Sequence, residues 1–218
     1  MFVDDIDAPA LHPADRHHLE RVLRLRSGAN ITVSDGLGRF RPARLGNSSL
    51  EPAGDVVEVP EPEPRLTVAF ALVKGERPEL VVQKLTEVGV DRIVPFVAER
   101  TVVRWNPVKG ARNVERLGAV AREAAAQCRR AWLPEVASVA TFADAAAWPG
   151  AALAHPDGDT PTLDHPTLLI GPEGGWSPEE EDAVPARVRL GPHVLRAETA
   201  AIVAGAFLAG LRAGVLAP

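Results

Sequence analysis

The sequence predicts an α/β fold, in which a mostly parallel sheet covered by helices follows a small β-rich domain. Short apolar segments typical of strands alternate with helical segments between residues 66 and 211, and this alternation is typical of a parallel sheet with helices on both faces. A proline-rich stretch, VPEPEPRL at residues 59–66, precedes that part. Repeated X-Pro steps favour an extended linker. We therefore expect two domains, residues 1–62 and residues 63–218.

The first domain is expected to contain a short basic helix and a β-hairpin. The helix is predicted over residues 17–25 and is ended by Ser27-Gly28. Strands are predicted over residues 31–34, 39–45 and 55–59. Gly36, after Asp35, and Gly38 supply the positive-φ positions that a hairpin turn requires.

The second domain begins with a buried strand over residues 66–73 and a helix from Pro78 that Gly89 closes as a left-handed cap. A strand over residues 92–97, interrupted at Pro95, comes next. A helix is then predicted over residues 114–131, capped by Asn113. Further strands are predicted over residues 151–154, 168–170 and 187–190.

The last predicted helix, residues 200–211, is apolar on every face. Such a helix is buried in a core or in a subunit interface, and we expect a dimer contact.

Composition excludes some classes of protein. The chain of 218 residues is 46% hydrophobic and 24% charged, as in ordinary globular proteins, and its longest apolar stretch is too short for a membrane span. The N-terminus does not resemble a secretory signal, and Cys128 is the only cysteine, so we expect a cytoplasmic protein without a disulfide. The six histidines show no metal-ligand spacing, so we expect no metal site.

The net charge of −5 conceals two basic segments. Residues 16–44 contain seven arginines and two acidic residues, and residues 100–132 contain eight basic and two acidic residues. Basic patches on an acidic body indicate a surface for a polyanion, although solvated helix and hairpin faces are an alternative interpretation.

Two glycine-bearing turns near the C-terminus indicate a ligand site. Residues 171–175 read GPEGG and precede a helix start in which Ser177 caps and Glu180 completes a capping box. The second turn, residues 190–199, lies roughly twenty residues further on. Both could meet at the carboxyl ends of parallel strands, where ligands bind. The known phosphate-loop and dinucleotide motifs are missing from the sequence, so a ligand read by main-chain groups, such as an adenine ring, stays open. The alternative is a purely structural turn.

Several segments resemble the ribosomal RNA small subunit methyltransferase E family. They are HHLERVLRLRSG, SDGLGRF, VKGERPELVVQKLTEVGVDRIVPFVAERTVVRW, AREAAAQCRRAWLPEV, LLIGPEGGWSPEEEDA and LGPHVLRAETA. The last two, in this order and spacing, are the specific ones. The resemblance implies a PUA-like β-barrel followed by a SPOUT-class α/β domain with a C-terminal trefoil knot. It also implies a cytoplasmic homodimer that uses S-adenosylmethionine to methylate N3 of one uridine in 16S rRNA within the small ribosomal subunit, without a metal.

The resemblance assigns site residues by position. It places the cofactor at Leu169, Ile170, Gly171, Pro172, Glu173, Gly174 and Gly175, and at Leu190, Gly191, Val194, Leu195, Arg196 and Thr199. It places RNA phosphates at Arg21, Arg24, Arg26 and Arg39, and at the pair Arg129 and Arg130. Arg129 stands where the family often has glycine, which leaves open which arginine of the pair contacts RNA.

Methylation at uracil N3 requires loss of the N3 proton. We expect Arg130 or Arg196 to stabilise the developing negative charge, and Glu198 or Glu173 to accept the proton. Two alternatives stay open: a methyltransferase of the same class that acts on another RNA position, and a non-catalytic RNA-binding assembly factor.

Overall fold

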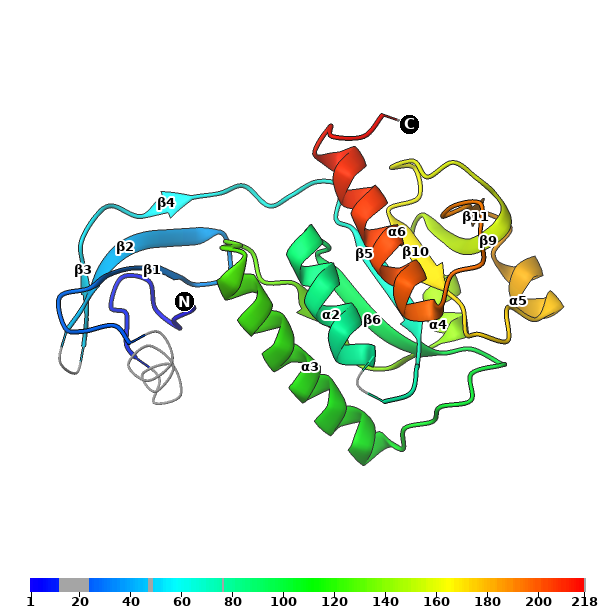
Figure 1. Cartoon of the computed structure of the whole chain (residues 1–218), viewed down its shortest axis with the longest axis horizontal. Coiled ribbons are helices and arrows are strands. Elements are labelled where there is room, and N and C mark those ends of the chain that lie inside the picture. The colour runs from blue at the N-terminus through cyan, green and yellow to red at the C-terminus, as the bar shows by residue number, and fades with distance from the viewer. Residues whose placement is uncertain (12–23, 47–48, 76, 218) are drawn as a thin grey trace. The chain divides into compact units, whose positions relative to one another are not determined.

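The computed structural model describes residues 1–11, 24–46, 49–75 and 77–217 (Figure 1). They form two compact units. The first unit consists of Met1–Glu61 and Ala125–Leu133, and the second consists of Pro62–Ala124 and Pro134–Pro218. Most of the helix predicted over residues 17–25 lies outside the described residues.

The first unit contains a four-stranded antiparallel sheet. Its strands are β1 (Asn30–Ser34), β2 (Arg39–Leu45), β3 (Leu50–Pro52) and β4 (Val57–Glu58). Strand β2 pairs with β1 on one edge and with both β3 and β4 on the other. Gly36 and Gly38 have φ values of 75° and 94°, which confirms the predicted turn chemistry between β1 and β2.

Residues 125–133, which we call the strap, complete the first unit. The strap runs along the β1–β2 turn: Leu133 N donates to Gly36 O at 2.9 Å, and Gly38 N donates to Ala131 O at 3.1 Å. A Cβ atom at Gly38 would lie 2.6 Å from the Trp132 ring, so glycine is required there. The strap is therefore part of the first unit although it follows more than sixty residues of the second.

The second unit is built on a parallel sheet of seven strands. They are β5 (Thr67–Ala71), β6 (Arg92–Val97), β7 (Glu135–Val136), β8 (Ala140–Thr141), β9 (Ala151–Asp159), β10 (Thr167–Ile170) and β11 (Arg187–Val188). Their order is β11-β9-β10-β5-β6-β7, with β8 also paired to β6, and every pairing is parallel. The predicted parallel α/β fold is confirmed.

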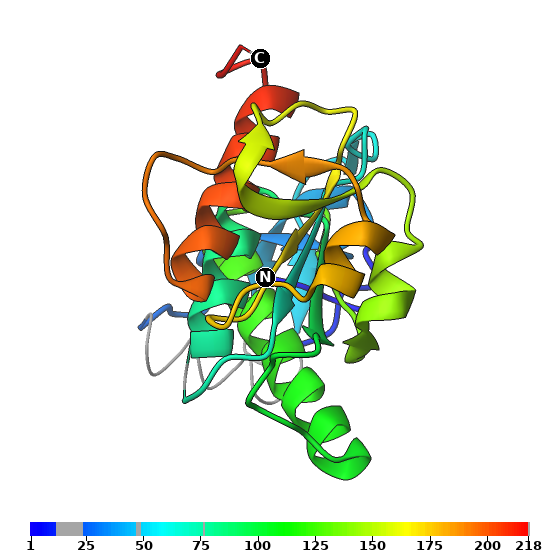
Figure 2. The same cartoon turned by 90° about the vertical axis from the view of Figure 1, so that its right-hand side faces the viewer.

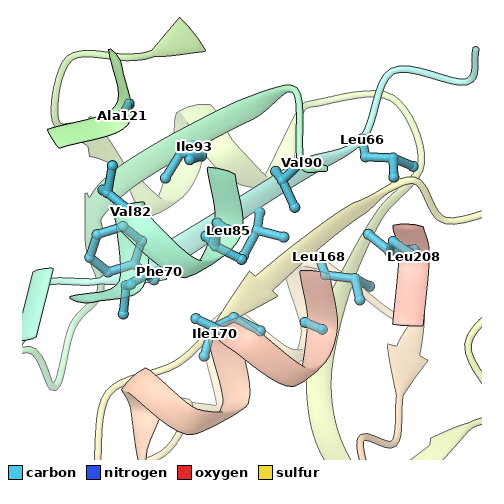
Figure 3. Close-up of a cluster of buried hydrophobic side chains, with 14 of the residues drawn as sticks. Leu66, Phe70, Val82, Leu85, Val90, Ile93, Ala121, Leu168, Ile170 and Leu208 are labelled. Atoms are coloured by element: carbon cyan, nitrogen blue, oxygen red, sulfur yellow. The ribbon is translucent and has the colours of Figure 1, made fainter. Parts of the chain in front are cut away.

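Helices cover both faces of this sheet, as Figure 2 shows. They are α2 (Arg77–Val88), α3 (Pro107–Gln127), α4 (Phe142–Ala146), α5 (Pro178–Ala183) and α6 (Ala197–Arg212). Alternate strand residues point to opposite faces. Val68 and Phe70 of β5 pack with α2, α3 and α6 in one core (Figure 3), whereas Ala69 and Ala71 pack with α4 and the segment around α5 in the other.

Helix α3 differs from its prediction at both ends. It begins at Pro107, and Asn106 Oδ1 accepts a hydrogen bond from Lys109 N at 2.8 Å, so Asn106 rather than Asn113 is the cap. Proline suits the first helical turn, where no N–H bond is needed. The helix ends at Gln127 because Arg129 adopts a left-handed φ of 61° and Arg130 N bonds back to Ala125 O.

Strand β6 passes through Pro95 without the predicted interruption. On one side it pairs with β5 from Arg92 to Phe96. On the other side β7 pairs up to Ile93 and β8 begins at Phe96. Pro95, which has no N–H to donate, lies in the gap between these two partners.

Candidate ligand pocket at the carboxyl edge of the sheet

The pocket lies where the chain changes its winding direction. Strands β5 and β10 are parallel neighbours at the centre of the sheet. The connection after β5 runs through α2 on one face, and the connection after β10 runs through α5 on the other. The carboxyl ends of two such strands diverge into loops that leave a crevice between them, which is the usual ligand site of open α/β sheets.

The two predicted glycine turns meet in this pocket, which has a volume of about 410 Å³. This volume lies within the usual range for small-molecule sites. Its lining residues come from β9, from the end of β10 and the loop that leads into α5, from α5 itself, and from the segment that leads from β11 into α6, with Arg100 from the segment after β6. They are Arg100, Ala154, His155, Pro156, Ile170, Gly171, Pro172, Glu173, Gly175, Trp176, Glu181, Leu190, Gly191, His193, Val194, Leu195, Ala197 and Ala200.

Most of the residues that the sequence proposed for a cofactor line this pocket, but four do not. Leu169 is fully buried in β10, and Gly174 and Thr199 are exposed. Arg196, the N-cap residue of α6, is exposed between Leu195 and Ala197, which both line the pocket.

The loop after β10 is anchored at its far end by a buried carboxylate. Ser177 and Glu180 form the predicted capping box of α5. Glu180 Oε2 accepts from Ser177 N at 3.0 Å, and its Oε1 accepts from Glu99 N at 2.8 Å. Glu180 is only 5% exposed, so these bonds are protected from water. The helix start therefore also ties the loop to the segment after β6.

Trp176 forms one wall of the pocket. Its Nε1 donates to Ala154 O at 3.0 Å, and its ring packs against Phe96 and Phe142. A Cβ at Gly171 would come within 2.9 Å of the indole, so the backbone of Gly171 lies directly against this ring. Glycine here follows from close approach rather than from a positive φ.

Sequence reasoning missed a polar part of the pocket lining, formed by His155 and Glu181. His155 Nδ1 accepts from Asp157 N at 3.1 Å, and its Nε2 lies 3.7 Å from Glu181 Oε1. Glu181 Oε2 in turn pairs with Arg187 Nη2 at 2.9 Å. His155 belongs to β9 and Glu181 to α5, and no local motif relates the two, so only the folded chain brings them together.

Arg77 was also missed. Its Nη1 lies 3.6 Å from Glu173 Oε1, and its Nε lies 3.5 Å from Glu198 Oε1. Glu198 does not line the pocket, although Ala197 and Ala200 on the same helix do. Both carboxylates that the sequence proposed as proton acceptors therefore contact one guanidinium.

The proposed RNA-binding arginines that the structure describes belong to the first unit. Arg24, Arg26 and Arg129 are exposed, whereas Arg130 is half-buried and its Nε donates to Trp132 O at 3.1 Å. Arg39 pairs with Asp7 at 3.1 Å and lies 3.8 Å from Glu58, and the hydrogen bond that it donates to Asp7 raises the pKa of its guanidinium. Arg21 lies outside the described residues.

In the part of the chain that the structure describes, no helix is both long and apolar enough to cross a membrane. Across the same residues, His, Cys, Asp and Glu side chains form no group of three that could hold a metal ion.

This parallel α/β fold, with its pocket at the carboxyl edge of the sheet, belongs to an RNA methyltransferase, as two sequence profiles show. The sequence profile of an RNA methyltransferase domain matches residues 60–209, and that of an RNA methyltransferase PUA domain matches residues 13–51. The chain is also 34% identical to a ribosomal RNA small subunit methyltransferase E from Mycobacterium bovis, over 94% of this chain and 88% of the relative. The chain belongs to the ribosomal RNA small subunit methyltransferase E family.

Solved structures agree with this assignment. A methyltransferase from Legionella pneumophila in complex with S-adenosylmethionine is 30% identical, with a TM-score of 0.83 over 95% of each chain. A ribosomal RNA small subunit methyltransferase E from Neisseria gonorrhoeae bound to S-adenosylmethionine is 26% identical, with a TM-score of 0.82 over 97% of this chain and 96% of that one.

Proposed function

We propose that this chain transfers a methyl group from S-adenosylmethionine to N3 of one uridine in 16S rRNA of the small ribosomal subunit. The observation that carries the proposal is the single pocket formed by the loop after β10 and the segment before α6. Family membership, together with two similar structures that hold S-adenosylmethionine, supports this pocket as the cofactor site.

The residues of the pocket fit this cofactor. Ile170, Leu190 and Leu195 supply apolar surface for a purine ring, and the glycines let main-chain groups reach its polar edge. Glu173 and Glu181 supply negative charge for a cationic ligand. When bound, S-adenosylmethionine supplies a methyl group on a positively charged sulfur, which leaves as a neutral thioether.

The reaction at uracil requires removal of one proton. The N3–H bond breaks, its electron pair forms the new N–C bond to the methyl carbon, and the proton must leave to a base. Both carboxylates contact Arg77, but Glu173 lines the pocket and Glu198 does not, so Glu173 would be the residue that accepts the proton. Arg196, exposed between two lining residues, would stabilise negative charge on the uracil oxygens.

The first unit would hold the RNA. The exposed guanidinium groups of Arg24, Arg26 and Arg129 suit phosphate oxygens, and the half-buried Arg130 of the strap would add a further cation in the same unit. Arg39 would have to exchange its pairs with Asp7 and Glu58 for a phosphate. N3 lies on the pairing edge of uracil, so the target base must be unpaired when it reaches the pocket.

The proposal includes a homodimer, a trefoil knot in the second unit and action in the cytoplasm, where small subunits are found. The homodimer is supported by α6, which buries Ala201, Ala204 and Leu208 in the core. Its other face leaves Ile202, Val203 and Phe207 partly exposed and Ala206 exposed. A helix with two apolar faces can serve a core and a subunit interface at once.

The test is methylation of small subunits isolated from cells that lack this activity. The protein is incubated with them and with methyl-labelled S-adenosylmethionine, and the 16S rRNA is digested for mass spectrometry. The proposal predicts one N3-methyluridine, and a Glu173→Gln variant should give much slower methylation. Label on another base or on a ribose would indicate another RNA target. Absence of any label, with no binding of S-adenosylmethionine by calorimetry, would favour a non-catalytic assembly factor.

A further inference from the structure

We propose that Arg77 is a positioning residue that fixes the distance between the two halves of the cofactor pocket. The inference rests on the proposed function, because it concerns the pocket assigned to S-adenosylmethionine. Arg77 contacts Glu173 of the loop after β10 and Glu198 of α6, with nitrogen–oxygen distances of 3.6 and 3.5 Å. It is the first residue of a third element, α2.

Helix electrostatics do not explain an arginine at this position. The N-terminus of a helix carries partial positive charge, which disfavours a cation in its first turn. Glu79 supplies the favourable charge in the first turn of α2. Arg77 is therefore stabilised by its contacts with the pocket elements and not by its own helix.

The contact with Glu198 reaches the pocket through the first turn of α6. Ala197 and Ala200 line the pocket, and residues three apart share one side of a helix. Glu198 lies between them in sequence and projects from a different side, towards Arg77. The contact between Arg77 and Glu198 therefore holds the orientation of α6, the helix that carries these two lining residues.

Glu198 depends on Arg77. Its side chain is 13% exposed, and among the residues that the structure describes no hydrogen-bond donor reaches its buried Oε2 atom. A carboxylate in this setting needs a neighbouring cation. Without Arg77 we expect Glu198 to turn towards water and to shift the start of α6.

The bridge requires the shape of a guanidinium. Its planar fork presents several N–H groups in fixed directions, so one side chain can hold carboxylates on two elements. The compact ammonium group of lysine keeps the charge but is less able to contact both. Arg77→Lys therefore separates the geometric role from the role of charge.

An ion pair between α2 and α3 provides a matched control. Glu79 of α2 is 19% exposed, has a buried Oε2 atom with no described donor, and pairs with Arg116 at 2.6 Å. Neither Glu79 nor Arg116 lines the pocket. Arg116→Gln leaves a similar carboxylate without its cation, but away from the cofactor.

The experiment is calorimetric titration of the full-length protein with S-adenosylmethionine, for the wild type and the variants Arg77→Gln, Arg77→Lys and Arg116→Gln. We expect Arg77→Gln to raise the dissociation constant about tenfold or more, since small displacements of positioning groups have large effects. Arg77→Lys should recover only part of this loss. Arg116→Gln should bind like the wild type, although both glutamine variants lower the melting temperature by similar amounts.

Three results would overturn the inference. Wild-type affinity in Arg77→Gln would show that the bridge does not position the pocket. An equal loss of affinity in Arg116→Gln would show a general effect of destabilisation, and full recovery in Arg77→Lys would show that charge alone matters. Failure of the wild type to bind S-adenosylmethionine would instead contradict the proposed function, so the two failures are distinguishable.

Discussion

The indole of Trp176 stacks on the ring of Phe96, with centroids 6.1 Å apart and planes inclined by 12°. Phe96 belongs to β6, and Trp176 belongs to the loop that follows β10. Because Trp176 also bonds to Ala154 of β9, one side chain connects three parts of the second unit at the wall of the pocket.

Trp176→Phe should keep the aromatic packing but leave the carbonyl of Ala154 without its donor. An unpaired polar group in a part-buried site costs about 1 to 2 kcal/mol of the free energy of unfolding. Urea unfolding measures this loss. Trp148→Phe, at a site away from the pocket, is the control for indole removal and should lose less stability in the same measurement. A Trp176→Phe protein as stable as the wild type would show that this hydrogen bond contributes nothing.

Glu180→Ala should lower the free energy of unfolding more than most substitutions of a charged residue do. It removes a buried carboxylate that accepts from two backbone amides, and bonds to charged groups contribute about 1.5 to 3 kcal/mol each. We expect a loss of roughly 2 to 4 kcal/mol in chemical unfolding. Glu179→Ala, one residue earlier and exposed, should change stability by less than about 0.5 kcal/mol. Equal losses in the two variants would contradict the anchoring role of Glu180.

Gly205→Ala should destabilise the protein although alanine is the better helix former. The new Cβ would lie 2.5 Å from Leu85 Cδ2 and 3.0 Å from Val90 Cγ2, both in the core. Overpacking costs about 1 to 3 kcal/mol and outweighs a propensity gain of about 1 kcal/mol. In Gly118→Ala, a Cβ in α3 would meet no described atom within 4 Å beyond its neighbours and its own helix backbone, so this variant should be more stable than the wild type. Stabilisation by both variants would show that α6 can move away from α2 at no cost.

Arg129→Gly should be more stable than Arg129→Ala, with a free energy of unfolding about 1 kcal/mol higher. Residue 129 has a φ of 61°, which strains every residue with a Cβ, whereas glycine adopts it freely. Comparison with alanine isolates the backbone term, since both variants lack the guanidinium. Thermal unfolding of the two proteins gives the answer, and a more stable alanine variant would refute the strained conformation.

The carboxyl pKa of Asp144 should lie below its ordinary value. The main cause is the hydrogen bond from the Thr141 hydroxyl, and the second is the hydrogen bond from the Thr141 amide. The ionised form is thus favoured by folding, so its contribution to stability is present above pH 3.8 and is lost as the pH falls through the lowered pKa. Thr141→Val should bring the pKa back towards 3.8, as measured by carboxyl-carbon NMR titration. Asp5, whose pKa is lowered mainly by the amides of Asp7 and Ala8, should titrate unchanged in that variant.

Local patterns in the sequence predicted much of the second unit. The apolar runs of β5, β6 and β10 and the Ser177–Glu180 capping box are signals within a few residues, and the structure contains all of them. The sequence pattern predicts the start of α3 too late, because Asn113 has the residue type of a helix cap, whereas Asn106 and Pro107 form the actual helix start.

Other features depend on contacts between distant residues. The pairing of Gly38 with Ala131 joins the strap to the first hairpin, and neither segment alone indicates it. Likewise, Arg77 is an ordinary helical residue in the sequence, and its partners Glu173 and Glu198 become visible only in the fold. Sequence patterns place elements, but they do not show which loops converge when no local motif relates them.

The most direct test of the whole account is a crystal structure of this protein with S-adenosylhomocysteine, the product that remains after methyl transfer. We predict that its nucleoside lies between the Gly171–Gly175 loop and the Leu190–Ala200 segment, against Trp176. A product molecule bound at any other place on the protein would contradict it.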